Sequence, residues 1–68
     1  SNEMPNETIK DILMRRDGMS ADEADELIAE AKDALMEHLD SGDMLLAEEV
    51  CEEYFGLEPD YLFEIMPF

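Results

Sequence analysis

The spacing of apolar residues between positions 20 and 39 constrains the fold most strongly. Intervals of three and four residues place these side chains on one face of a helix. That face carries Ala24, Leu27, Ile28, Ala31, Leu35, His38 and Leu39. Ser20 followed by Glu23 is the signature of a capping box, in which each side chain accepts a hydrogen bond from the other residue's backbone N–H. The sequence therefore predicts a long helix that begins near Ser20 and ends at Ser41 and Gly42.

A shorter helix is predicted before this one, from near Asn6 to about Arg16. Its apolar residues fall on one face, namely Ile9, Ile12 and Leu13. Gly18 supplies the stop, because glycine readily adopts the left-handed conformation that ends many helices. Arg15 and Arg16 lie in the last turn, where positive charge suits the helix dipole.

A third helix is predicted from near Asp43 to Tyr54 or Phe55, where Gly56 ends it. The following residues are candidates for burial on this helix: Leu46, Ala47, Val50, Cys51, Tyr54 and Phe55. Helical spacing again places most of them on one face, so this segment is expected to pack against the long helix.

A short fourth helix is predicted over roughly residues 59–66. Pro59 suits the first helical position because its φ is already fixed near the helical value, and Glu58 is the expected cap. Leu57, Leu62 and Ile65 are expected to face inward. Tyr61 and Phe63 are expected to be partly exposed.

Together these helices predict an all-α fold, a small bundle of about four helices with a helix-turn-helix-like C-terminal corner. Residues 6–68 form a single helical domain, and residues 1–5 are interpreted as a flexible N-terminus in which Ser1 and Asn2 are a candidate tag remnant. The predicted core consists of Leu27, Ile28, Ala31, Leu35, Val50, Cys51, Phe55, Leu57, Leu62 and Ile65.

Charge excludes several function classes. Twenty acidic residues against four basic ones give a net charge of −16. Direct binding to nucleic acid is not expected, since it depends on lysine and arginine that neutralise phosphates. Anionic membranes are excluded for the same reason, and the apolar runs are too short for a membrane span. A cytoplasmic, soluble protein is expected.

Few residues are candidates for chemistry. Cys51 lies on an apolar face among glutamates, conditions that raise a thiol pKa and make it inert. His38 sits at the inward edge of the second helix without the partner residues of a metal or catalytic motif. The acids around Gly42 lack the ligand spacing of a calcium loop. We therefore predict no catalytic, cofactor-binding or metal-ligating residues, and not an enzyme.

The C-terminal stretch YFGLEPDYLFEI resembles part of the helix-turn-helix of arabinose-regulator-type transcription factors. The resemblance rests on Cys51, Phe55, Gly56, Leu57, Pro59, Tyr61, Leu62 and Ile65. It implies a helical corner, but the helix that would read bases carries Glu58, Asp60 and Glu64 in place of basic residues. These carboxylates repel phosphate, so the corner is interpreted as a packing device.

Residues 8–66 also resemble a group of small, acidic, uncharacterised helical proteins of bacteria and prophages, which end in a similar GLEPDYL stretch. The resemblance implies a mobile-element origin. It implies no activity and no active site.

Methionines and aromatic residues suggest a contact surface. Six methionines are many for so small a core, and flexible thioethers suit adaptable interfaces. One interpretation is that they fill gaps in the core. The other is an exposed apolar patch formed by Met14, Met36 or Met44 together with Tyr61 and Phe63.

Two function hypotheses remain. The first is an interaction module or regulator that binds a protein partner with a basic surface, through Glu48, Glu49, Glu52, Glu53, Tyr61 and Phe63. The second is a nucleic-acid mimic that inhibits a DNA- or RNA-binding protein, such as a defence nuclease or repressor. Its phosphate substitutes would be Glu30, Asp33, Glu37, Glu48, Glu49, Glu52 and Glu53. A homodimer is a further expectation, because a chain of this length buries only roughly 60% of its unfolded surface.

Overall fold

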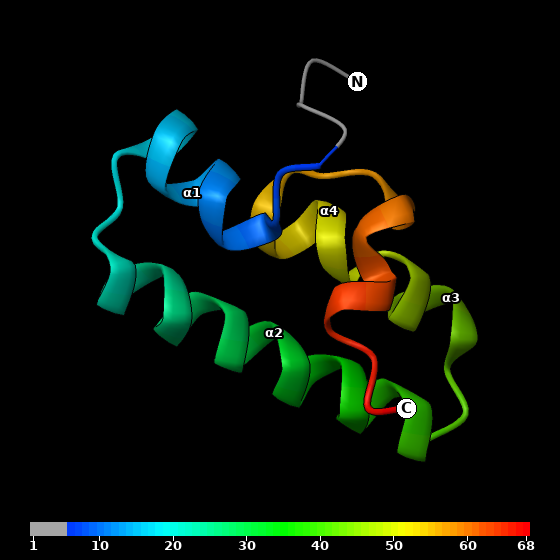
Figure 1. Ribbon diagram of the computed structural model, residues 1–68. Helices are drawn as coiled ribbons and strands as arrows, with labels where there is room; N and C mark the ends of the chain where they lie inside the picture. Colours follow the sequence, from blue (N-terminus) through cyan, green and yellow to red (C-terminus); the bar gives the residue numbers. More distant parts are fainter. Residues whose placement is uncertain (1–5) are drawn as a thin grey trace.

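The computed structural model describes residues 6–68, which fold into five helical segments (Figure 1). These are α1 (Ile9–Asp17), α2 (Ala21–Asp40), α3 (Met44–Glu48), α4 (Val50–Phe55) and a 3-10 helix, η1 (Pro59–Glu64). The described residues contain no strand, so the all-α prediction is confirmed. The prediction for residues 1–5 lies outside the described residues.

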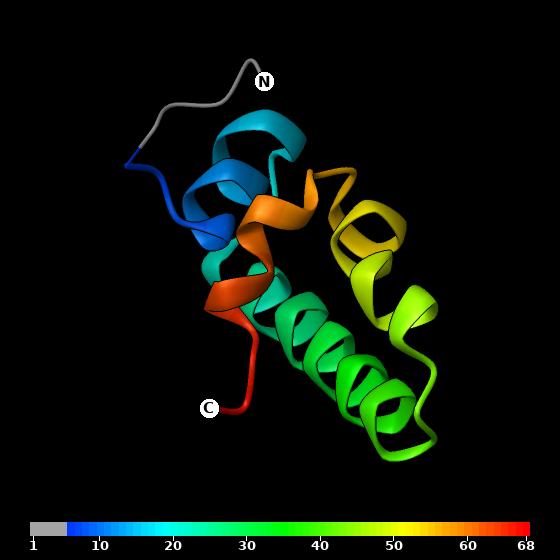
Figure 2. The same ribbon diagram turned by 90° about the vertical axis from the view of Figure 1, so that its right-hand side faces the viewer.

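The long helix α2 is the element against which most of the others pack. α1 lies over its first half and α3 near its end, while α4 also contacts it (Figure 1). In Figure 1 η1, α3 and α4 all lie on the same face of α2, and the view turned by 90° shows η1 next to α4 (Figure 2). This arrangement encloses the core between α2 and the shorter helices.

Capping boxes fix the beginnings of α1 and α2. The Glu23 N–H donates to Ser20 Oγ over 3.1 Å and the Ser20 N–H donates to Glu23 Oε1 over 2.8 Å, which confirms the predicted box. A second box joins Thr8 and Asp11 by two bonds of 3.1 Å. The predicted start of α1 near Asn6 is therefore early, because Thr8 holds the N-cap position.

The predicted third helix is two helices, α3 and α4, that meet at Glu49. The Glu49 N–H donates to the carbonyl of Leu46 over 3.1 Å, a bond that spans three residues and tightens the turn. α3 begins near Asp43 as predicted, and Asp43 caps it, since its carboxylate accepts from the Leu46 N–H over 3.1 Å. We attribute the break to packing, because α3 and α4 both contact α2 and the tight step changes the chain direction between them (Figure 1).

The predicted fourth helix forms as a 3-10 helix. Pro59 lies in its first turn, and Glu58 holds the N-cap position with an extended backbone. The Tyr61 N–H donates to the Glu58 carbonyl over 3.2 Å, again across three residues. A six-residue 3-10 helix turns more tightly than the α-helix expected here, and it has no fully buried residue of its own.

The buried core draws on all four α-helices and on the two residues Leu57 and Ile65 that flank η1. It consists of Ile9, Ile12, Leu13, Ala24, Ala31, Leu35, Ala47, Val50, Cys51, Phe55, Leu57 and Ile65. Leu27, Ile28 and Leu62 were expected among them but are only half-buried at the edge of the core. Leu46 was a candidate for burial but is 40% exposed, because the five-residue α3 buries only Ala47.

The two ends of the domain are joined by one side chain. Glu64, at the end of η1, accepts a hydrogen bond over 3.0 Å from the backbone N–H of Ile9, the first residue of α1. That N–H has no acceptor within its own helix, and a carboxylate also suits the positive end of the helix dipole. Glu64 therefore completes the start of α1 from the far end of the sequence.

Candidate functional site

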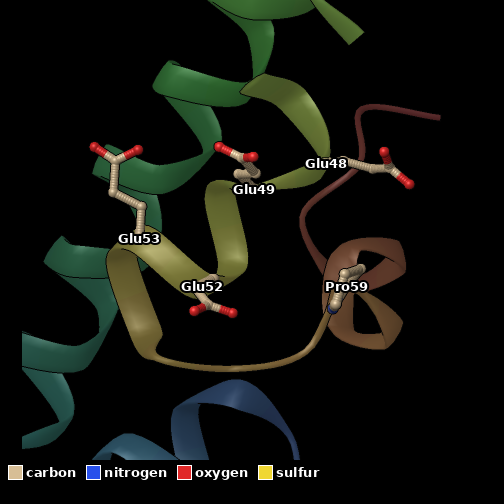
Figure 3. A pocket seen from close by; sticks show the side chains of 5 residues that line it. All are labelled: Glu48, Glu49, Glu52, Glu53 and Pro59. Carbon is tan, nitrogen blue, oxygen red and sulfur yellow. The ribbon is translucent and has the colours of Figure 1, made fainter. Parts of the chain in front are cut away.

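The four predicted partner-binding glutamates lie together on the outer surface of α3 and α4. Glu48 belongs to α3, Glu49 to the break, and Glu52 and Glu53 to α4; all four are exposed. With Pro59 at the start of η1 they line an open hollow, called here the acidic hollow (Figure 3). In that view Glu48 and Glu53 lie at its two ends.

Three of the four basic residues are engaged elsewhere on the molecule, and the fourth, Lys32, lies on α2. Lys10 pairs with Asp25 over 3.0 Å, Arg15 with Glu7 over 2.8 Å and Arg16 with Asp17 over 2.8 Å. All three pairs involve α1 or its surroundings and the first turns of α2. The acidic hollow therefore keeps an uncompensated negative field, which reaches roughly 8 Å into solution at physiological ionic strength.

A second, apolar hollow lies beside the acidic one. It has a volume of about 160 Å³ and is lined by Leu35, Leu39, Met44, Ala47, Glu48, Leu62 and Met66. Its walls come from the second half of α2, from α3, from η1 and from the residues after η1. Met44 is 62% exposed and Met66 41% exposed, so two thioethers are accessible at its edge.

Glu48 lines both hollows and so joins them. The element η1 also contributes to both, through Pro59 in the acidic hollow and Leu62 in the apolar one. We refer to the two together as the paired hollows. One bound chain segment can therefore place an apolar side chain and a cation in adjacent sites.

Tyr61 and Phe63 do not line either of these hollows. Phe63 is 70% exposed, whereas Tyr61 is half-buried and packs against the core. Met14, Met36 and Met44 are all exposed, but Met14 lies on α1 and Met44 on α3, at opposite ends of α2 (Figure 1). Met14 and Met44 thus lie apart, whereas Met44 lines the apolar hollow with Leu62 of η1.

Leu35, Leu39, Leu62 and Met66 were not predicted as site residues. Leu35 and Leu39 appear in the apolar stripe of α2, and the spacing of four residues places them one above the other. Nothing in that pattern distinguishes a residue that lines an open hollow from one that is covered. Their role depends on where α3 and η1 end, which is a tertiary property.

Cys51 is the single cysteine of the chain. Cys51 is buried, and burial together with the charge of Glu64 raises the pKa of its thiol to about 11. At neutral pH it is therefore a protonated thiol with low reactivity. Among residues 6–68, no group of three or more His, Cys, Asp or Glu side chains is arranged to hold a metal ion. In the same part of the chain, no helix has the length and apolar character needed to cross a membrane.

Comparison with known proteins gave no relative: no protein-family model, no curated protein and no solved structure matches the chain.

Proposed function

We propose that this protein is a non-enzymatic interaction module that binds a protein partner with a basic surface. The observation that carries the proposal is the adjacency of the paired hollows, an apolar one and an acidic one that share Glu48. Apolar contact in a desolvated pocket supplies most of the affinity in protein complexes. Complementary charge increases the association rate and selects the partner. The exposed ring of Phe63 is proposed as an additional contact.

A nucleic-acid mimic is the second candidate. The exposure of Glu48, Glu49, Glu52 and Glu53 along α3 and α4 favours it, because a mimic needs carboxylates spread over an accessible face. Glu30, Asp33 and Glu37 on α2 are exposed as well. In this proposal the protein occupies the basic groove of a DNA- or RNA-binding protein, and the helical corner around Gly56 serves packing. A prophage origin would agree with either role.

Affinity capture from a host lysate, at low and at physiological salt, tests the interaction module. We expect a basic protein to be retained, and retained less at higher salt, since salt screens exposed charges. Failure to capture any protein under both conditions would count against the module. Duplex DNA serves as a control ligand, and its tight binding at physiological salt would contradict both candidates.

Two matched double variants then separate the candidates. E48Q/E52Q removes two carboxylates from the acidic hollow, and E26Q/E30Q removes two exposed carboxylates with the same spacing from α2. For the module, only E48Q/E52Q should slow association with the captured partner. For the mimic, both variants should weaken binding, because Glu30 also substitutes for a phosphate. Surface plasmon resonance measures these rates.

A further inference from the structure

The paired hollows define the chemistry of the segment that they bind. We propose that they hold a peptide segment of the partner in which one large apolar side chain lies next to lysine or arginine. The apolar side chain enters the apolar hollow and the cation lies over the acidic hollow. This inference rests on the proposed function and specifies its ligand.

The size of the apolar hollow favours a side chain over a small-molecule ligand. Sites for metabolites and cofactors usually have volumes of roughly 300–1,000 Å³. The apolar hollow has about 160 Å³, and its lining is apolar apart from Glu48. It offers room for a side chain such as leucine, methionine or phenylalanine, but few polar groups to orient a metabolite. The thioethers of Met44 and Met66 at its edge can adapt to such side chains.

Charge determines what flanks the apolar side chain. Glu48 lies between the hollows, and Glu49, Glu52 and Glu53 extend the negative surface from that point (Figure 3). An apolar segment flanked by acids would be repelled, whereas lysine or arginine would be attracted at the same site. The apolar hollow thus selects the large apolar side chain, and the acidic hollow selects the lysine or arginine next to it.

A second copy of the chain is a poor occupant. Each copy carries a net charge of −16, so two copies repel one another unless salt screens the charge. Three of the copy's four basic residues, Lys10, Arg15 and Arg16, are already paired with acids of their own chain. A basic segment of another protein brings the positive charge that the acidic hollow attracts, whereas a second copy brings mainly negative charge.

Selection from a random peptide library displayed on phage, with the purified chain as target, tests this inference. Binding of the selected peptides is then measured for the unaltered chain, for M44Q/M66Q and for M14Q. The substitution of methionine by glutamine leaves the charge unchanged, and Met14 matches Met66 in exposure, at 40% against 41%. Circular dichroism verifies that all three proteins are folded.

We expect the selected peptides to share a large apolar residue beside lysine or arginine. M44Q/M66Q should weaken their binding about tenfold, the usual effect of losing one buried apolar contact, and M14Q should leave it unchanged. In the unaltered chain labelled with 13C at the methionine methyl groups, the Met44 and Met66 signals should shift on binding while that of Met14 stays in place.

Several results would overturn the inference. They are a failure to select any peptide, selection of peptides that carry lysine without an apolar residue, and equal binding by M44Q/M66Q and the unaltered chain. Dimerisation that M44Q/M66Q abolishes would assign the apolar hollow to a second copy instead. If a partner is captured from lysate equally well by M44Q/M66Q, the interaction module stands and this site is rejected. If no partner is captured, the proposed function itself fails.

Discussion

The guanidinium of Arg16 donates a hydrogen bond of 2.6 Å to the backbone carbonyl of Phe55. Arg16 lies in the last turn of α1, and Phe55 is the last residue of α4, just before Gly56 with φ of 64°. The last carbonyls of a helix have no N–H donor within that helix, so Arg16 supplies one. A positive charge at this end also suits the helix dipole. Arg16 therefore fixes the corner after α4 to α1.

Arg16→Ala should destabilise the protein by about 1.5–3 kcal/mol, the usual contribution of a hydrogen bond to a charged group. Arg15→Ala is the matched control, since Arg15 pairs with Glu7 at the surface, where such pairs contribute about 0–1 kcal/mol. Urea unfolding followed by circular dichroism measures both free energies. Equal losses of unfolding free energy for the two variants would show that the bond to Phe55 contributes no more than a surface ion pair.

Phe55→Ala should cost about 3–5 kcal/mol, because it leaves a cavity where the largest fully buried side chain stood. A loss of that size approaches the whole stability of a small domain. Phe63→Ala provides the control, as this ring is 70% exposed and its removal should change stability by less than about 0.5 kcal/mol. Thermal melts compare the unfolding midpoints of the two variants. An unchanged midpoint for Phe55→Ala would show that this residue is not part of the core.

The capping box of α2 should make part of the stability depend on pH. Hydrogen bonds from the backbone and side chain of Ser20 lower the pKa of Glu23 below its usual 4.5. A carboxyl with a lowered folded-state pKa stabilises the protein above the unfolded pKa and loses this effect as pH falls through the folded pKa. Glu23→Ala should therefore be less stable than the unaltered chain at neutral pH, and the difference should shrink below about pH 4.5.

Glu26→Ala controls for the loss of one exposed acid from a strongly negative chain. Subtracting its effect from that of Glu23→Ala leaves the part that belongs to the capping box. Urea titrations at several pH values between neutrality and strong acid provide the comparison. A Glu23→Ala difference that stays constant with pH would disprove the role of the carboxylate in capping.

Cys51 should react slowly with alkylating reagents in the folded protein. Raising the thiol pKa from 9.0 to about 11 reduces the thiolate fraction at neutral pH about a hundredfold, and burial slows access further. Iodoacetamide labelling followed by mass spectrometry, in buffer and in concentrated urea, tests this. Rapid labelling without urea would mean that the region around Cys51 opens readily.

Self-association should increase with salt. Two chains that each carry −16 repel one another at low ionic strength, and the Debye length falls to about 10 Å at 0.1 M salt. Sedimentation at low and moderate salt should therefore show a growing dimer population. A monomer at every salt concentration, even with concentrated protein, would contradict the prediction of a homodimer.

Local sequence signals predicted the helices that have strong caps. Ser20 with Glu23 marked the start of α2, and Gly18 and Gly56 marked two ends correctly. Thr8 with Asp11 has the Thr-x-x-acid spacing of a capping box, but an aspartate stands in place of the usual glutamate or glutamine. The start of α1 was therefore placed too early.

The break at Glu49 had no sequence signal. Ala47, Val50, Cys51 and Phe55 keep the spacing of one continuous helical face across it, and neither glycine nor proline interrupts the segment. We attribute the tighter turn to the packing of α3 and α4 against α2. The apolar hollow was missed for the same reason, whereas the grouping of the four glutamates followed from helical spacing alone.

The bond between Glu64 and Ile9 bears on how the chain is made. A ribosome releases α1 long before it adds the carboxylate that completes the beginning of that helix. The first turn of α1 thus lacks a native contact until η1 has been synthesised. A chain shortened before residue 64 should therefore lose order at its first turn as well as at its end.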